Sequence, residues 1–179
     1  MKIRNGFVSN SSSSSFVVAF PHKPTSAEDV KEMMFGKQEW HYIGDIYSED
    51  DNTDAPTIGI AQKVFNKINK KATKKEMFEA IRNGWFSYYI DRELLPGMYE
   101  SFEETKDLTY KNDKEKIEEI WAKGDKINDK RVNDIVKIFR ENNKDKFFVV
   151  MDFSDNDGEE IEEHTDIFNR LEHIRTSYH

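Results

Sequence analysis

Residues 9–20 of the chain read Ser-Asn-Ser-Ser-Ser-Ser-Ser-Phe-Val-Val-Ala-Phe, a serine run followed directly by a short apolar segment. Phe16–Phe20 is rich in β-branched and aromatic residues and ends before Pro21, so it is predicted to be a buried strand. Hydroxyl and backbone N–H groups just ahead of a strand can cradle a phosphate, which makes Ser11, Ser12 and Ser13 candidate ligand-binding residues. A flexible serine linker is the alternative.

A second apolar segment, Phe147–Phe153, is the strongest strand signal in the sequence. It is apolar on both faces except at Asp152, so we expect it to be central in its sheet. Asp152, Asp155 and Asp157 lie at or just beyond its end, where a rigid strand can aim carboxylates at one divalent metal ion. The alternative is a polar turn in which these side chains bond their own backbone.

The last residues of the chain alternate in chemical character. In an extended segment His173, Arg175, Ser177 and His179 share one face, because successive side chains point to opposite sides. Imidazole, guanidinium and hydroxyl groups on one face suit an anion or phosphate, so His173, Arg175 and Ser177 are candidate ligand-binding residues. A frayed, solvated tail is the alternative.

The middle of the chain is dominated by helix signals. Ser26 is a predicted N-cap with Gly36 as the stop, and Thr73 with Glu76 has the spacing of a capping box. Other expected helices begin near Pro56, cover 113–123 up to Gly124, follow Asn128, and lie around 164–171. We expect a strand or hairpin arm at 40–47 and irregular structure over 98–112.

Composition limits the class of protein. The chain has 179 residues, no cysteine and a net charge of −8, which indicate one cytoplasmic domain without disulfides or thiolate chemistry. No apolar run has membrane-spanning length, and the acidic balance argues against nucleic acid as a partner. A basic patch of six lysines is interpreted as a solvated face, since no interleaved aromatics suggest base stacking: Lys63, Lys67, Lys70, Lys71, Lys74 and Lys75.

Both ends of the chain carry motifs that resemble a group of uncharacterised proteins from tailed bacteriophages and some bacteria. At the start the resemblance rests on Lys-Ile-Arg-Asn-Gly-Phe-Val-Ser-Asn-Ser-Ser-Ser-Ser-Ser-Phe, residues 2–16. At the end it rests on Phe153-Ser154-Asp155 with Asp157-Gly158, then Glu163-His164, Phe168 and His173-Ile174-Arg175. The resemblance implies a phage-like origin and a meeting of the two termini, without implying a reaction. Residues 21–146 take no part in it.

Together these patterns predict one α+β domain over residues 1–179. We expect a small sheet that pairs Phe16–Phe20 with Phe147–Phe153 and with 173–178, and helices that cover one face of it. The function predicted first is binding of an anionic ligand, a phosphate or nucleotide, where the two ends meet, with a divalent metal ion as a possible cofactor. A phosphoesterase is the enzymatic version, in which Arg175 neutralises developing charge. The alternative is a non-enzymatic protein that binds and inhibits a host protein, with purely structural termini.

Overall fold

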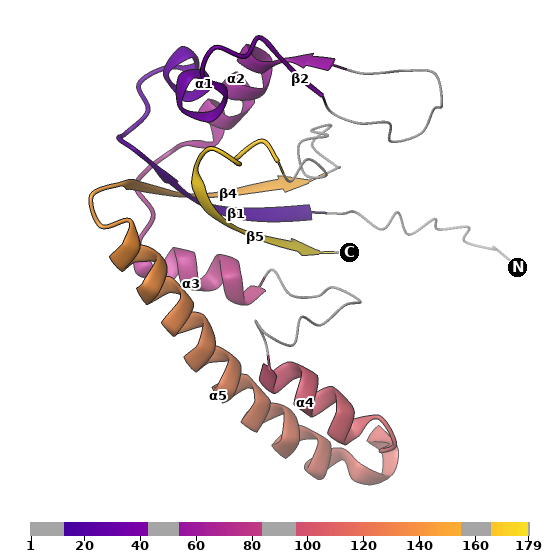
Figure 1. The fold of residues 1–179 in the computed structure, drawn as a ribbon. Helices are drawn as coiled ribbons and strands as arrows, with labels where there is room; N and C mark the ends of the chain where they lie inside the picture. The colour runs from indigo at the N-terminus through magenta and orange to yellow at the C-terminus, as the bar shows by residue number, and fades with distance from the viewer. Residues whose placement is uncertain (1–12, 43–53, 84–95, 155–165, 179) are drawn as a thin grey trace, which may run out of the picture.

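A computed structural model of the chain describes residues 13–42, 54–83, 96–154 and 166–178. The fold is α+β, with helices packed around an antiparallel sheet of three strands (Figure 1). The strands are β1 (Ser13–Phe20), β4 (Phe147–Ser154) and β5 (Glu172–Tyr178), in the order β4-β1-β5. The predicted pairing of an early strand with two late ones is therefore confirmed.

The central strand is β1, so the prediction of a central Phe147–Phe153 was wrong. Phe16 lies opposite Met151 on one side and Arg175 on the other. The apolar character of β4 has another cause, because helices cover both of its faces. Its outer edge is also partly bonded, since the backbone N–H of Ala72 donates to the carbonyl oxygen of Phe148 at 2.8 Å.

The helices pack on both faces of the sheet, whereas the sequence predicted only one covered face. On one side, here called the α1/α2 face, Phe16, Val18 and Phe20 pack against α1 (Ala27–Phe35) and α2 (Thr57–Lys67). On the other, the α3/α5 face, Val17 and Ala19 pack against α3 (Lys74–Asn83) and α5 (Tyr110–Asn142). Since β1 is apolar at every position from 16 to 20, both of its faces must be covered.

Two helices of unequal length form an arm that extends away from the sheet (Figure 1). Residues 98–112, expected to be irregular, contain most of α4 (Pro96–Thr105), and α5 continues through Gly124, the predicted stop. The backbone of α5 is non-helical at Asp113 (φ −122°, ψ 23°), so a short first turn precedes the long helix. The glycine serves packing instead of termination. A Cβ on Gly124 would collide with the carbonyl oxygen of Gly97 and with Oγ of Ser101, so its absence lets α4 approach closely.

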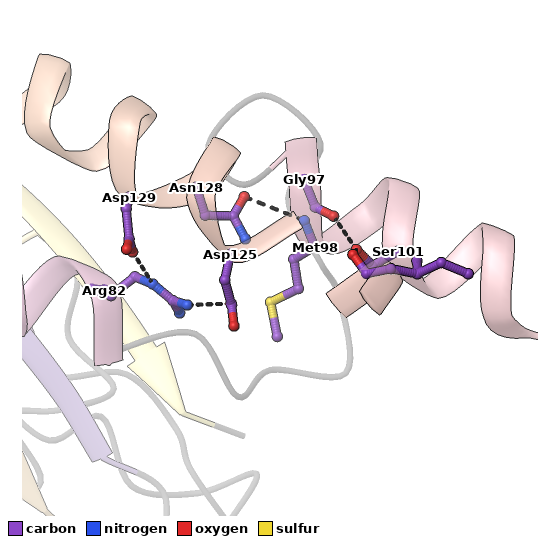
Figure 2. A network of polar contacts seen from close by, with 8 residues as sticks. Arg82, Gly97, Met98, Ser101, Asp125, Asn128 and Asp129 are labelled. Atoms are coloured by element: carbon purple, nitrogen blue, oxygen red, sulfur yellow. Dashed lines mark hydrogen bonds and ion pairs between the residues drawn. The ribbon is translucent and has the colours of Figure 1, made fainter. Parts of the chain in front are cut away.

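Polar contacts hold this arm together and join it to α3, as Figure 2 shows. Arg82 at the end of α3 donates from Nε to Oδ1 of Asp129 at 2.8 Å and is also paired with Asp125. Within the arm, the backbone N–H of Met98 donates to Oδ1 of Asn128 at 3.2 Å. These contacts fix where α5 leaves the sheet.

Local signals at the ends of α1 and α3 were predicted correctly. The N–H of Asp29 donates to Oγ of Ser26 at 3.2 Å, and Gly36 ends α1 with φ at 60°. At α3 both hydrogen bonds of the capping box form. The backbone N–H of Glu76 donates to Oγ1 of Thr73 at 3.2 Å, and the backbone N–H of Thr73 donates to Oε2 of Glu76 at 2.8 Å.

The predicted 40–47 strand is found in part. β2 (Trp40–Tyr42) pairs with β3 (Asp54–Pro56), and residues 43–47 lie outside the described part. Residues 166–171 form turns where a helix was expected. In the described ranges, none of the helices combines the length and apolar character needed to cross a bilayer.

Candidate functional site

The side chains of Arg175 and Ser14 meet where the two chain ends pair. Arg175 donates from Nη2 to Oγ of Ser14 at 3.1 Å, and its Cζ lies 5.8 Å from the ring centroid of Phe16. Ser14 is buried and Arg175 is half-buried. The hydroxyl and the ring therefore hold the planar guanidinium in one orientation on the α1/α2 face of the sheet.

A second cation reaches the same face from α2. Nζ of Lys67 lies 5.0 Å from the ring centroid of Phe153, and the Phe153 and Phe16 rings meet edge to face at 5.8 Å. Arg175 and Lys67 thus flank one aromatic pair. We call Ser14, Lys67 and Arg175 the terminal site.

The opposite face of the same strand ends is tied by other polar contacts. Ser15 donates from Oγ to Oδ1 of Asp152 at 2.5 Å, a charge-assisted bond. Oγ1 of Thr176 donates to the backbone carbonyl of Ala80 in α3 at 3.3 Å. Both Ser15 and Thr176 are buried, so this group links strands to each other and to α3.

The structure describes only one of the three aspartates that were predicted to bind a metal ion. Asp152 is described and exposed, whereas Asp155 and Asp157 lie outside the described residues. Among the described residues, no group of three or more His, Asp or Glu side chains is close enough to hold a metal ion. A metal site that includes Asp155 and Asp157 therefore stays a prediction.

His173 shares the α1/α2 face with Arg175 but has different neighbours. Its ring centroid lies 6.5 Å from that of Phe16 and 6.0 Å from that of Phe168. Nδ1 lies 2.9 Å from the carbonyl oxygen of Leu171, which can only accept, so Nδ1 carries the proton. In the neutral ring Nε2 is then an acceptor.

The remaining predicted ligand residues are described only in their backbone or not at all. Ser13 lies in β1 opposite Ser154 and Tyr178, and Ser177 lies in β5 opposite Ser14. Ser11 and Ser12 lie outside the described residues. Of the serine run, it is Ser14 that contacts Arg175. Strand alternation contains the signal, because Ser14 and Phe16 share a face and Arg175 pairs with Phe16.

Sequence reasoning also missed a pairing of His41 in β2 with a residue near the start of the last strand. Nε2 of His41 lies 3.1 Å from Oδ1 of Asp166, and the side chain of His41 is only 11% exposed. Its ring also lies 5.3 Å from that of Phe35 at the end of α1. No local pattern predicts this contact, because the two residues are 125 positions apart.

A cavity of about 170 Å³ lies beside the terminal site, between β4 and the α2–α3 connection. Its lining includes Lys67, Asn69, Lys70, Glu76 and Val150. Nζ of Lys70 donates a hydrogen bond to Oε1 of Glu76 at 2.6 Å, so the two side chains form an ion pair. That hydrogen bond, together with those from the Thr73 backbone and hydroxyl, lowers the pKa of Glu76 to about 2. At neutral pH the cavity therefore has two ammonium groups against one carboxylate.

Comparison of the whole chain with protein-family models, with curated proteins and with solved structures found no match. Any statement about function therefore rests on the residues and contacts described above.

Proposed function

We propose that the chain binds a small anionic group, a phosphate or the phosphate of a nucleotide, at the terminal site. The observation that supports this is the orientation of Arg175, held by Ser14 and Phe16 with Lys67 on the same aromatic pair. A guanidinium keeps its charge at all pH values that proteins encounter, and its fork matches two oxygens of a phosphate. Partial burial strengthens its attraction for an anion relative to water.

In this proposal Arg175 supplies the bidentate contact and Lys67 supplies a second positive charge. The 170 Å³ cavity that Lys67 lines extends the cationic surface towards Asn69 and Lys70. Ser11, Ser12, Ser13 and Ser177 remain proposed donors next to it, and His173 is a proposed neighbour on the same face.

Binding is favoured over hydrolysis because the described groups for catalysis are divided between the two faces. Asp152 pairs with Ser15, whereas Arg175 pairs with Phe16, and adjacent strand positions face opposite sides. The carboxylate of Asp152 therefore lies across the sheet from the guanidinium. We propose a binding protein and assign no reaction to it.

A thermal-shift series tests the proposal on the full chain. The ligands are inorganic phosphate, pyrophosphate and a panel of nucleotides, each with and without Mg²⁺. At least one should raise the melting temperature of the native protein, and Arg175→Met should abolish that rise. Lys116→Met, which removes an exposed charge on the arm, is the matched control and should keep it. No rise for the native protein, or an equal rise for Arg175→Met, would refute the proposal.

A second candidate, a non-enzymatic interaction protein, is supported by the arm. Phe102 in α4 is 51% exposed and Tyr110 in α5 is 60% exposed. Exposed aromatic side chains are enriched in protein interfaces. Under this alternative the contact of Arg175 with Ser14 is a structural clasp. A stoichiometric bacterial partner that is retained by Arg175→Met and lost by Phe102→Ser with Tyr110→Ser would favour it.

A further inference from the structure

A second cavity lies on the α3–α5 side of the molecule. Its volume is about 370 Å³, and Lys74, Lys75, Phe78 and Asn133 line it. Sites for small molecules in proteins occupy roughly 300–1,000 Å³. The volume falls within this range, and the cavity is wide open to solvent, so a ligand bound there would stay partly exposed.

The charge around this cavity is opposite to that of the whole chain. The chain has a net charge of −8, yet the cavity is lined by two ammonium groups, those of Lys74 and Lys75. Nζ of Lys75 lies 3.6 Å from Oε1 of Glu79, and the side chain of Lys75 is 82% exposed. Exposed charges more than about 10 Å apart are largely screened at 0.1 M salt, so distant acidic residues do not cancel the charge of these two lysines.

The walls of the cavity supply two further kinds of contact. Phe78 is half-buried and packs against the core of the α3/α5 face, which holds its ring in place. Nδ2 of Asn133 donates to the backbone carbonyl of Asp129 at 2.8 Å. This bond fixes the amide and leaves Oδ1 to accept. The basic patch therefore has an adjacent aromatic side chain, which the sequence alone had not indicated.

We propose that the α3–α5 cavity binds a phosphorylated nucleoside, either as a free nucleotide or as one unit of a single-stranded nucleic acid. The base stacks on Phe78 and donates an amino hydrogen to Oδ1 of Asn133, while Lys74 and Lys75 neutralise the phosphate. This assignment is independent of the terminal site, because it uses α3 and α5 and no residue of β1 or β5.

Two kinds of ligand distinguish a free nucleotide from a single-stranded nucleic acid. AMP and ATP are titrated into the full chain by calorimetry, and a fluorescein-labelled oligodeoxyadenylate by anisotropy at several salt concentrations. Saturable binding of the mononucleotides supports the free ligand. Saturable binding of the oligonucleotide alone supports the single strand. Absence of binding by both overturns the proposal.

Charge reversal tests the role of the two lysines. Lys74→Glu with Lys75→Glu should weaken binding at least about tenfold and reduce the salt dependence, since each lost phosphate contact lowers the slope by about one. The variant should still fold, because carboxylates are favourable in the first turn of a helix. The matched control, Lys111→Glu with Lys116→Glu, makes the same charge change at least about 25 Å from Asn133 along α5 and should bind normally. Equal weakening in both would overturn the proposal.

Two substitutions test the walls. Phe78→Leu keeps an apolar side chain and removes the stacking surface, so it should weaken binding about fivefold to a hundredfold, with Asn133→Ala acting in the same direction. Thermal melts confirm that the variants are folded. If both variants are folded and bind as tightly as the native protein, the cavity is not the site. Arg175→Met should leave this binding unchanged, which separates it from the terminal site.

Discussion

Arg175 donates a hydrogen bond from Nη2 to Oγ of Ser14 at 3.1 Å, although the two residues are 161 positions apart in the chain. The contact exists because β1 lies between β4 and β5, so both late strands lie beside the first. A cationic side chain from one end of the chain is thereby oriented by a buried hydroxyl from the other. Several consequences can be measured without a ligand.

The hydrogen bond should be visible as an energetic coupling between the two residues. Ser14→Ala should lower the free energy of unfolding by about 1–3 kcal/mol, because it removes a buried acceptor of a charged donor. In a double-mutant cycle with Arg175→Met, denaturant unfolding should give a coupling energy above about 0.5 kcal/mol. Additive effects of the two substitutions would show that the bond contributes nothing.

The close approach of α4 to α5 should be sensitive to a single added methyl group. In Gly97→Ala the new Cβ would collide with the carbonyl oxygen of Gly124 and lie 2.8 Å from Cβ of Ile127. Because backbone is in the way, we expect a loss of about 1–3 kcal/mol in the free energy of unfolding.

Gly59 in α2 provides the control for Gly97→Ala. Nothing lies within 4 Å of a Cβ placed there, so Gly59→Ala should stabilise the protein by about 0.4–1 kcal/mol through the unfolded chain. Denaturation of both variants by urea checks the pair. A Gly97→Ala variant as stable as Gly59→Ala would contradict the packing of the arm.

Glu76 should make stability depend on pH in the acid range. Its pKa is lowered from 4.5 to about 2 by Lys70 and Thr73, so the charged form is favoured in the folded state. This contribution is fully present above pH 4.5 and is lost as the pH falls through about 2. Glu76→Gln should remove this part of the pH dependence of the melting temperature. A carboxyl resonance of Glu76 that titrates near 4.5 would disprove the arrangement.

The attachment of α3 to α5 should be stabilised by the ion pairs of Arg82. Its side chain is 25% exposed and is paired with Asp125 and Asp129, so Arg82→Met should cost about 1 kcal/mol of unfolding free energy. The comparison is Lys75→Met, whose pair with Glu79 lies on one exposed helix turn and should matter by less than about 0.5 kcal/mol. Faster hydrogen exchange in α3 and α5 should accompany the first variant only.

The parts of the fold that follow from local chemistry were predictable. The strand β1 and the caps at Ser26 and Thr73 have short-range signals in hydrophobicity and residue type. The continuation of α5 through Gly124 was not predictable, because Gly124 ends helices in isolation and here is held by its contact with Gly97. Likewise, which strand is central depends on packing of both faces, which an apolar run alone does not specify.

The candidate sites show the same contrast between features that local sequence predicts and features that depend on long-range packing. Alternation along the C-terminal residues correctly placed His173 and Arg175 on one strand face. The partners of Arg175 depend on register with a distant strand, and Lys67 arrives from α2, so neither could be seen in the sequence. Phe78 lies one helical turn from Lys74 in α3, and Asn133 joins them only because α3 packs along α5.

An NMR titration of the ¹⁵N-labelled chain with inorganic phosphate tests whether the paired chain ends form an anion site around Arg175. We expect saturable shifts of the Arg175 Nε–Hε resonance and of the backbone amides around Ser14 and Arg175. A titration in which these signals do not move, or in which shifts are confined to Lys74, Lys75, Phe78 and Asn133, would contradict it.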